Sequence, residues 1–226
     1  MRKTTTFAGL GLAVALTLSG CAAGATTETN TETSADVTSM HDHDYVNNAG
    51  SDLRAALQGV LYEHVFLAGA AINQALKDGG DLTAPRTAAA VQALDDNSVA
   101  VAALVGSAYP EAEQPFLDSW RSHIPLFVEY TLGKVGNDQA MVDAAVAGLG
   151  EYAVSFGQLI NSVVPTLPAE AVQAELEMHA TTLLAAIDAD IAGDPGYFTL
   201  LQQSATHMQM TAAALAGGIA ADKDIK

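Results

Sequence analysis

The chain has 226 residues, a formal net charge of −17 and only nine Lys and Arg side chains. Half of the residues are hydrophobic and 15% are charged, so the chain is long and apolar enough to bury a substantial core. The shortage of cations excludes the basic surface on which phosphate binding depends, and nucleic acid is therefore not an expected partner.

The first residues have the pattern of a targeting segment. Arg2 and Lys3 precede an apolar stretch from Phe7 to Leu18, which leads into Leu18-Ser19-Gly20-Cys21. This apolar stretch is too short to span a bilayer well. The final four residues resemble the lipobox of bacterial lipoproteins, with a Leu, two small residues and then the Cys. The resemblance implies cleavage before Cys21 and attachment of lipid, including palmitate, to that residue.

Residues 1–20 are accordingly expected to be a lipoprotein signal peptide, with Cys21 as the lipidation site. The protein would then be extracytoplasmic and would be held at the cell membrane by its lipid. The alternative is an ordinary signal peptide in which Cys21 is incidental. Because Cys21 is the only cysteine, we expect neither a disulfide framework nor a thiolate metal ligand.

Residues 21–50 are rich in small and polar side chains and contain almost no large apolar ones. Such a segment cannot bury enough surface to fold, so we expect a flexible tether between the membrane and a folded domain. Near its end stands His41-Asp42-His43-Asp44, which contains four side chains of types that bind divalent cations. The simpler interpretation of this segment is a polar linker.

Residues 51–221 show helical periodicity, and no part of them alternates with a period of two for long enough to indicate a strand. The pattern predicts an all-α bundle of about six helices, built from three αα-hairpins. Gly, Pro and Asp residues separate the expected helices. These helices cover Leu53 to Lys77, Pro85 to Ala108 with a candidate break near Asp95, Glu111 to Val135, Gln139 to Val163, the residues between Pro168 and Gly193, and Tyr197 to Ala220.

Pro125 falls inside the third expected helix, where a proline costs about 3 kcal/mol unless the backbone adapts. We therefore expect a kink or a shifted helix start there. The hairpins also show similar spacings, since His123 precedes Asp138 by 15 residues and His179 precedes Asp194 by the same number. This spacing favours internal duplication of a hairpin, and the alternative is ordinary punctuation between helices.

Three of the expected helices carry one His on their apolar face, where the side chain should point into the core. His64 lies in a seam with Leu57 and Leu67, and His179 lies in a seam with Leu176 and Leu183. The third seam is the most aromatic and contains Phe116, Trp120, His123, Phe127 and Tyr130. Hairpins that stack would bring these His residues together, so the sequence predicts a buried polar cluster.

Imidazole is the commonest transition-metal ligand near neutral pH, and helical bundles build metal sites from inward side chains. The candidate ligands include thioethers that lie next to His in the sequence, a combination that suits copper. The predicted set is His64, His123, His179, His207, Met178 and Met208. We therefore expect a binding protein for copper first and zinc second, serving capture, storage or delivery.

Several alternatives remain open at this stage. Each His could be a core residue bonded to a neighbouring polar group. Two of them could be axial ligands of a non-covalently bound haem. The domain could also be a metal-free helical module that binds another envelope protein. No catalytic set is identified: Glu63 directly precedes a His and Glu177 stands two residues before one, whereas the di-iron pattern needs a spacing of three, and a non-catalytic role is favoured.

The helical domain also resembles uncharacterised secreted bacterial helical proteins that contain His. The resemblance rests on Glu63-His64, on Trp120-Arg121-Ser122-His123 and on Met178-His179. It implies a secreted helical domain and no particular activity.

Overall fold

The computed structural model describes residues 48–225. These residues form helices and connecting turns without a strand, which confirms the predicted all-α bundle. The lipobox with Cys21, the tether up to residue 47 and the His41–Asp44 segment lie outside the described residues. The helices are α1 (Ala49–Lys77), α2 (Pro85–Ala108), the short 3-10 helix η2 (Pro110–Ala112), α3 (Glu113–Ser122), α4 (Ile124–Gly136), α5 (Gln139–Val163), α6 (Ala169–Ala192) and α7 (Tyr197–Lys223).

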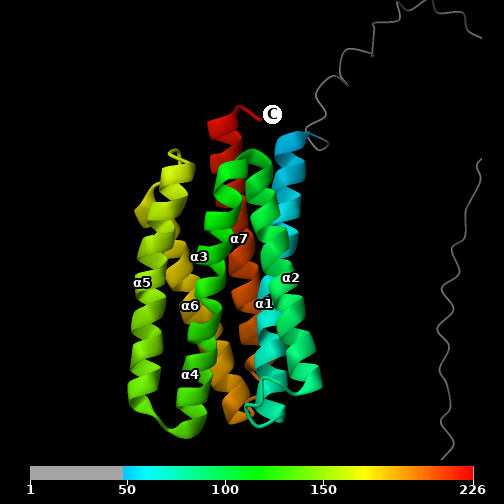
Figure 1. Cartoon of the computed structure of the whole chain (residues 1–226), viewed down its shortest axis with the longest axis vertical. Helices are drawn as coiled ribbons and strands as arrows, with labels where there is room; N and C mark the ends of the chain where they lie inside the picture. The colour runs from blue at the N-terminus through cyan, green and yellow to red at the C-terminus, as the bar shows by residue number, and fades with distance from the viewer. Residues whose placement is uncertain (1–47, 226) are drawn as a thin grey trace, which may run out of the picture. The chain divides into compact units, whose positions relative to one another are not determined.

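The helices pack side by side as a bundle in which α3 and α4 together form one long rod (Figure 1). Three hairpins make up the bundle: α1 with α2, α3 and α4 with α5, and α6 with α7. Each rod packs against the next one along the chain, and α7 packs along α1, so the ring of rods closes. Because α6 also touches α1 and α4, the interior of the ring is narrow.

Local signals explain where the helices begin and end. Asn48 caps α1 by accepting a hydrogen bond from the Ser51 backbone N–H at 2.9 Å. After α1 the chain reverses through Gly79 and Gly80, both with positive φ, a conformation that glycine adopts without steric cost. Pro85 stands at the start of α2, where its missing N–H removes no helical hydrogen bond.

The predicted helix bounds are close to the observed ones, with two informative differences. The candidate break near Asp95 does not occur, because α2 is continuous from Pro85 to Ala108. The predicted disturbance at Pro125 does occur: the chain leaves helical hydrogen bonding at His123, and α4 starts at Ile124. Pro125 has no N–H to donate to the Arg121 carbonyl, so a break just before it relieves the mismatch.

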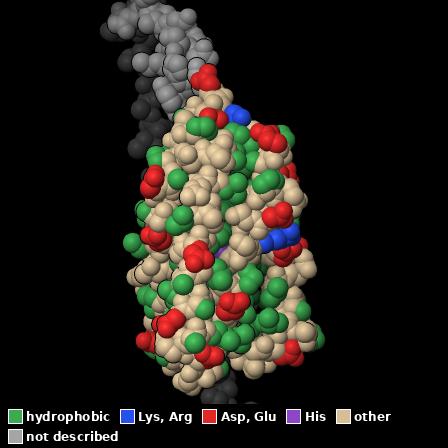
Figure 2. All heavy atoms as spheres, turned by 60° about the vertical axis from the view of Figure 1, so that its left-hand side comes forward, with side chains coloured by type: hydrophobic (Ala, Val, Ile, Leu, Met, Phe, Trp, Pro, Cys, Tyr) green, Lys and Arg blue, Asp and Glu red, His purple; other side chains and the backbone are tan. Residues whose placement is uncertain are grey.

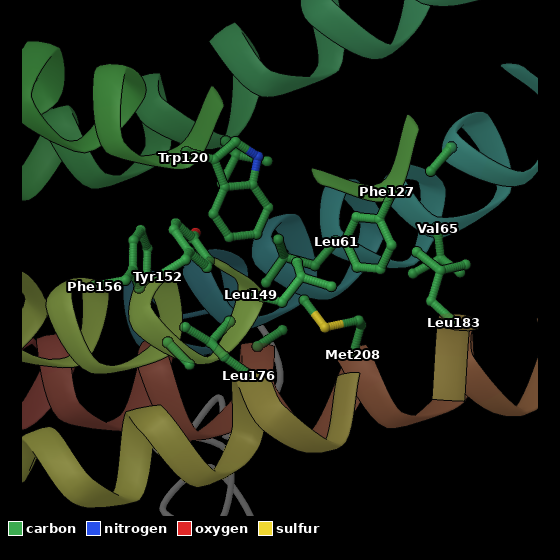
Figure 3. Packing of buried hydrophobic residues seen from close by; sticks show 14 of the residues in the cluster. Leu61, Val65, Trp120, Phe127, Leu149, Tyr152, Phe156, Leu176, Leu183 and Met208 are labelled. Carbon is green, nitrogen blue, oxygen red and sulfur yellow. The ribbon is translucent and has the colours of Figure 1, made fainter. Parts of the chain in front are cut away.

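Aromatic and aliphatic side chains are mixed in one continuous core. Trp120, Tyr152 and Phe156 lie side by side, and Leu61 and Met208 pack beside them (Figure 3). Trp120 is 3% exposed and Met208 is fully buried. The unique tryptophan is therefore a natural optical reporter of events in the core.

By length and composition alone, α1 and α2 could each cross a membrane. Core helices of soluble proteins meet the same criterion, and both helices pack against neighbours within this bundle. Their apolar character thus supports membrane association only weakly.

Candidate metal centre

His123 stands at the break between α3 and α4. His123 is the residue between the two helices, with φ −82° and ψ −22°, and it is 3% exposed. Trp120 lies one turn earlier, and the centroids of the two rings are 4.9 Å apart. The break before Pro125 thus falls beside an imidazole whose inward direction already follows from helical periodicity.

Two histidines from distant parts of the sequence meet at this point. The His64 ring on α1 lies 5.5 Å from the His123 ring and 5.0 Å from the Trp120 ring, measured between centroids. Tyr152 on α5 lies 4.9 Å from His123 on another side. The sequence prediction that inward imidazoles converge is therefore met by His64 and His123.

His179 extends the cluster from α6. Its ring centroid lies 6.2 Å from the Phe127 ring, which is itself 6.0 Å from the His123 ring. His123, Tyr152 and His179 also line one small internal cavity of about 10 Å³. Such a cavity is close to the least volume that holds one water molecule.

Polar atoms beside this small cavity lack partners. Both ring nitrogens of His179, Nδ1 of His123 and the hydroxyl of Tyr152 are buried and make no hydrogen bond within the described residues. An unpaired buried polar group costs about 1–3 kcal/mol, so these atoms are the ones in this part of the core that a ligand or a water molecule could bond to.

Asn97 on α2 fixes the protonation pattern of His64. Its amide Nδ2 donates to the Val60 carbonyl at 3.0 Å and to Glu63 Oε2 at 3.1 Å. Both partners are acceptors, so the other amide atom, Oδ1, faces His64 Nδ1 at 3.2 Å. Nδ1 of His64 must then carry the hydrogen, which leaves Nε2 with a free lone pair. Metal-binding histidines are commonly oriented through their second nitrogen in this way.

The three buried imidazoles are held neutral. Burial lowers the pKa of His64 from 6.5 to about 4, against a smaller opposing effect of the Asn97 hydrogen bond. Burial lowers the pKa of His179 to about 3. Burial, together with the proximity of His64 and His179, also holds the pKa of His123 well below its ordinary value. The neutral form is the one that can bind a metal ion.

The remaining predicted ligands lie elsewhere. His207 on α7 is bonded through Nε2 to the Glu175 carbonyl at 3.1 Å and lies 3.4 Å from its carboxylate. Met178 is 51% exposed, as expected for the residue next to an inward His on a helix. Met208 is fully buried and borders a separate apolar cavity with Leu61. The structure therefore brings together His64, His123 and His179 and leaves the two thioethers apart. It places His207 near enough to His179 to help burial lower the pKa of His179, but bonded to Glu175.

Asn97 and Tyr152 were not among the site residues predicted from the sequence. A signal for Asn97 was available, because it stands three residues after Leu94 and four before Val101, both of which are buried. A polar residue on such a helical face needs a partner in the core.

Within residues 48–225, no group of three or more His, Cys, Asp or Glu side chains is arranged to hold a metal ion. No protein-family model matches the chain, and searches of curated proteins and of solved structures found no match. The chemistry of the buried cluster is thus the basis on which a function can be argued.

Proposed function

We propose that this protein binds a single transition-metal ion, copper first and zinc second, in its core beside His123. The observation that carries the proposal is the set of unpaired nitrogens on His123 and His179 around one shared cavity. A core that keeps such groups without partners loses stability, and a bound ion would compensate for that loss. The role would be capture, storage or delivery rather than catalysis.

The geometry of the His64 and His123 pair supports the proposal. Two imidazoles bound to one ion through nitrogens about 2 Å from it have centroids roughly 5 to 6 Å apart. The observed separation of 5.5 Å falls in this range. His64 Nε2, whose lone pair is freed by Asn97, is then a natural ligand, and His123 contributes the second nitrogen.

The preference for copper follows from the number of ligands. Structural zinc sites have four ligands in a tetrahedron, and the three buried imidazoles His64, His123 and His179 would provide three at most. Copper(I) accepts fewer ligands and binds imidazole well. A small shift of the His179 ring would supply a third nitrogen, with Tyr152 as a further neighbour.

The experiment is a metal titration of the purified protein in which Trp120 fluorescence and bound metal are measured together. His41→Ala and His43→Ala are introduced throughout, so that the His-Asp segment of the tether cannot bind the added ion. We expect about one copper ion per chain, and quenching of Trp120 because His64 and His123 lie against it.

Substitution then assigns the ligands. His123→Leu combined with His179→Leu keeps the side-chain volume and should abolish binding, whereas His207→Ala should bind like the parent chain. Circular dichroism confirms that each variant is folded. Unchanged stoichiometry in the double variant, or no binding by the parent chain, would contradict the proposal.

We further propose, from the lipobox resemblance alone, that the protein acts at the outer face of the cell membrane, anchored by lipid on Cys21. Mass spectrometry of the mature N-terminus should show a chain that begins at Cys21 and carries acyl groups. A mature chain with an unmodified Cys21 would contradict the anchor and would leave the metal proposal untouched.

A further inference from the structure

A second and much larger cavity lies on the other side of His123. It has a volume of about 540 Å³ and lies between α1, α2 and α4, with Leu183 of α6 at its base. This volume falls within the range of about 300–1,000 Å³ that is usual for small-molecule sites. The size alone excludes a single metal ion as the occupant, so this cavity calls for a different ligand.

The cavity exists because α4 does not pack along α2. Contacts between these rods are made by α3, which lies before the break at His123, whereas α4 turns towards α5 and α6. The space that α4 leaves is lined mainly by aliphatic side chains. These include Ala71, Ile72, Leu94, Val128, Leu132 and Leu183. An apolar body is therefore the part of a ligand that this cavity would bury.

The apolar lining reaches the surface. Leu82, Val91, Leu132 and Val135 all line the cavity, and each is more than 40% exposed. Figure 2 shows one face of the bundle on which hydrophobic side chains gather among separate acidic groups, with a histidine visible between them. An opening with apolar edges lets an apolar molecule enter from water without passing a charged barrier.

The charges around the cavity exclude an anionic ligand. Among the described residues that line it, Arg121 is the only permanent cation. Its guanidinium is already paired with Asp95 through two hydrogen bonds of 2.6 and 2.8 Å. Glu129 adds a negative charge to the lining, and the chain as a whole is strongly acidic. A carboxylate or sulfonate would therefore meet repulsion and no free cationic partner.

The inner wall supplies polar contacts. His64 and His123 line it. Because His64 donates through Nδ1 to Asn97, its Nε2 can only accept a hydrogen bond. A ligand that reaches this wall is thus best matched by carrying an O–H or N–H group.

We infer that this cavity binds an uncharged, mainly apolar small molecule with one hydroxyl or N–H group, which lies at the His64 and His123 end. His64 and His123 both also belong to the proposed metal centre, so a metal ion and the polar group of this ligand would be alternative partners of His64 Nε2, while neither proposal requires the other. It would give the protein a second, organic ligand.

The probe for this inference is N-phenyl-1-naphthylamine, an uncharged aromatic amine with one N–H that fluoresces in apolar surroundings. It is titrated into the full chain in the presence of a chelator, so that bound metal cannot contribute. We expect saturable binding of about one probe per chain, with energy transfer from Trp120. The matched probe 8-anilinonaphthalene-1-sulfonate has the same rings and a negative charge, and it should bind at least about tenfold more weakly.

Ala71 and Ala70 offer a matched pair of substitutions on α1. Ala71 is buried and lines the cavity, whereas Ala70 is exposed and does not. Ala71→Phe should fill part of the cavity and weaken binding of the uncharged probe at least about tenfold, and Ala70→Phe should change it less than about twofold. If Ala71→Phe fails to fold by circular dichroism, Ala75→Phe takes its place. Equal binding by the two variants, or equal binding of the two probes, would overturn the inference.

Discussion

Lowering the pH from about 7 to 5 should reduce the free energy of unfolding of the metal-free protein by about 5 kcal/mol. The cause is the three buried imidazoles. Burial lowers the pKa of His64 to about 4 and that of His179 to about 3, and it also lowers the pKa of His123. In the unfolded chain all three titrate near pH 6.5.

Below pH 6.5 the unfolded chain therefore binds more protons than the folded one, and stability falls as pH falls. Each histidine lowers the free energy of unfolding by roughly 2 kcal/mol between pH 6.5 and 5. This loss continues until the pH reaches the pKa that the histidine has in the folded protein. Domains of this size are stable by about 5–15 kcal/mol, so the bundle should be near unfolding at pH 5.

Urea unfolding followed by circular dichroism at several pH values measures this effect. Protonation of carboxylates relieves repulsion in a chain of net charge −17. Hydrogen bonds from Thr87 and Thr83, in contrast, lower the pKa of Asp78 and Asp81, whose contribution to stability is therefore lost on acidification. The histidine contribution is therefore taken from the difference between the parent chain and a histidine variant. His179→Leu should make the pH dependence shallower by about one proton. The same pH dependence in the parent chain and in His179→Leu would show that the His179 imidazole is not held neutral in the core.

The fold was largely accessible from the sequence because its determinants are local. Gly79, Pro85 and Gly193 each end or begin a helix through backbone properties that depend on the residue itself. The break at Pro125 was predictable for the same reason. The inward direction of His64, His123 and His179 followed from helical periodicity, and all three are buried.

The site was only partly accessible, because pairing across the bundle is not encoded in any one helix. Nothing near His207 in the sequence reveals that its Nε2 reaches the Glu175 carbonyl on α6. The large cavity likewise depends on where α4 separates from α2, which is a property of the assembled rods. Met178 does not join the cluster for a simpler reason. It lies on the outer face of α6, because adjacent residues of a helix point in different directions and His179 points into the core.

Replacing His179 with leucine should stabilise the metal-free protein by about 2–4 kcal/mol, although most core substitutions destabilise. The imidazole is buried with both ring nitrogens unpaired, so its removal leaves no other group without a partner. Leucine has a similar volume and would continue the apolar seam of Leu176 and Leu183 on α6. The change thus removes an unfavourable polar group and retains the packing.

His64→Leu is the matched control, since it removes a paired imidazole from the same cluster. Asn97 Oδ1 would lose its hydrogen bond and remain buried, so this variant should be less stable by about 1–3 kcal/mol. Urea unfolding at neutral pH in a chelator compares the variants, and a destabilised His179→Leu would refute the argument. A metal ion at about 100 times its dissociation constant should add about 2.7 kcal/mol to the parent protein and much less to His179→Leu. A side chain that lowers the stability of the empty protein and raises that of the loaded one is there for its ligand.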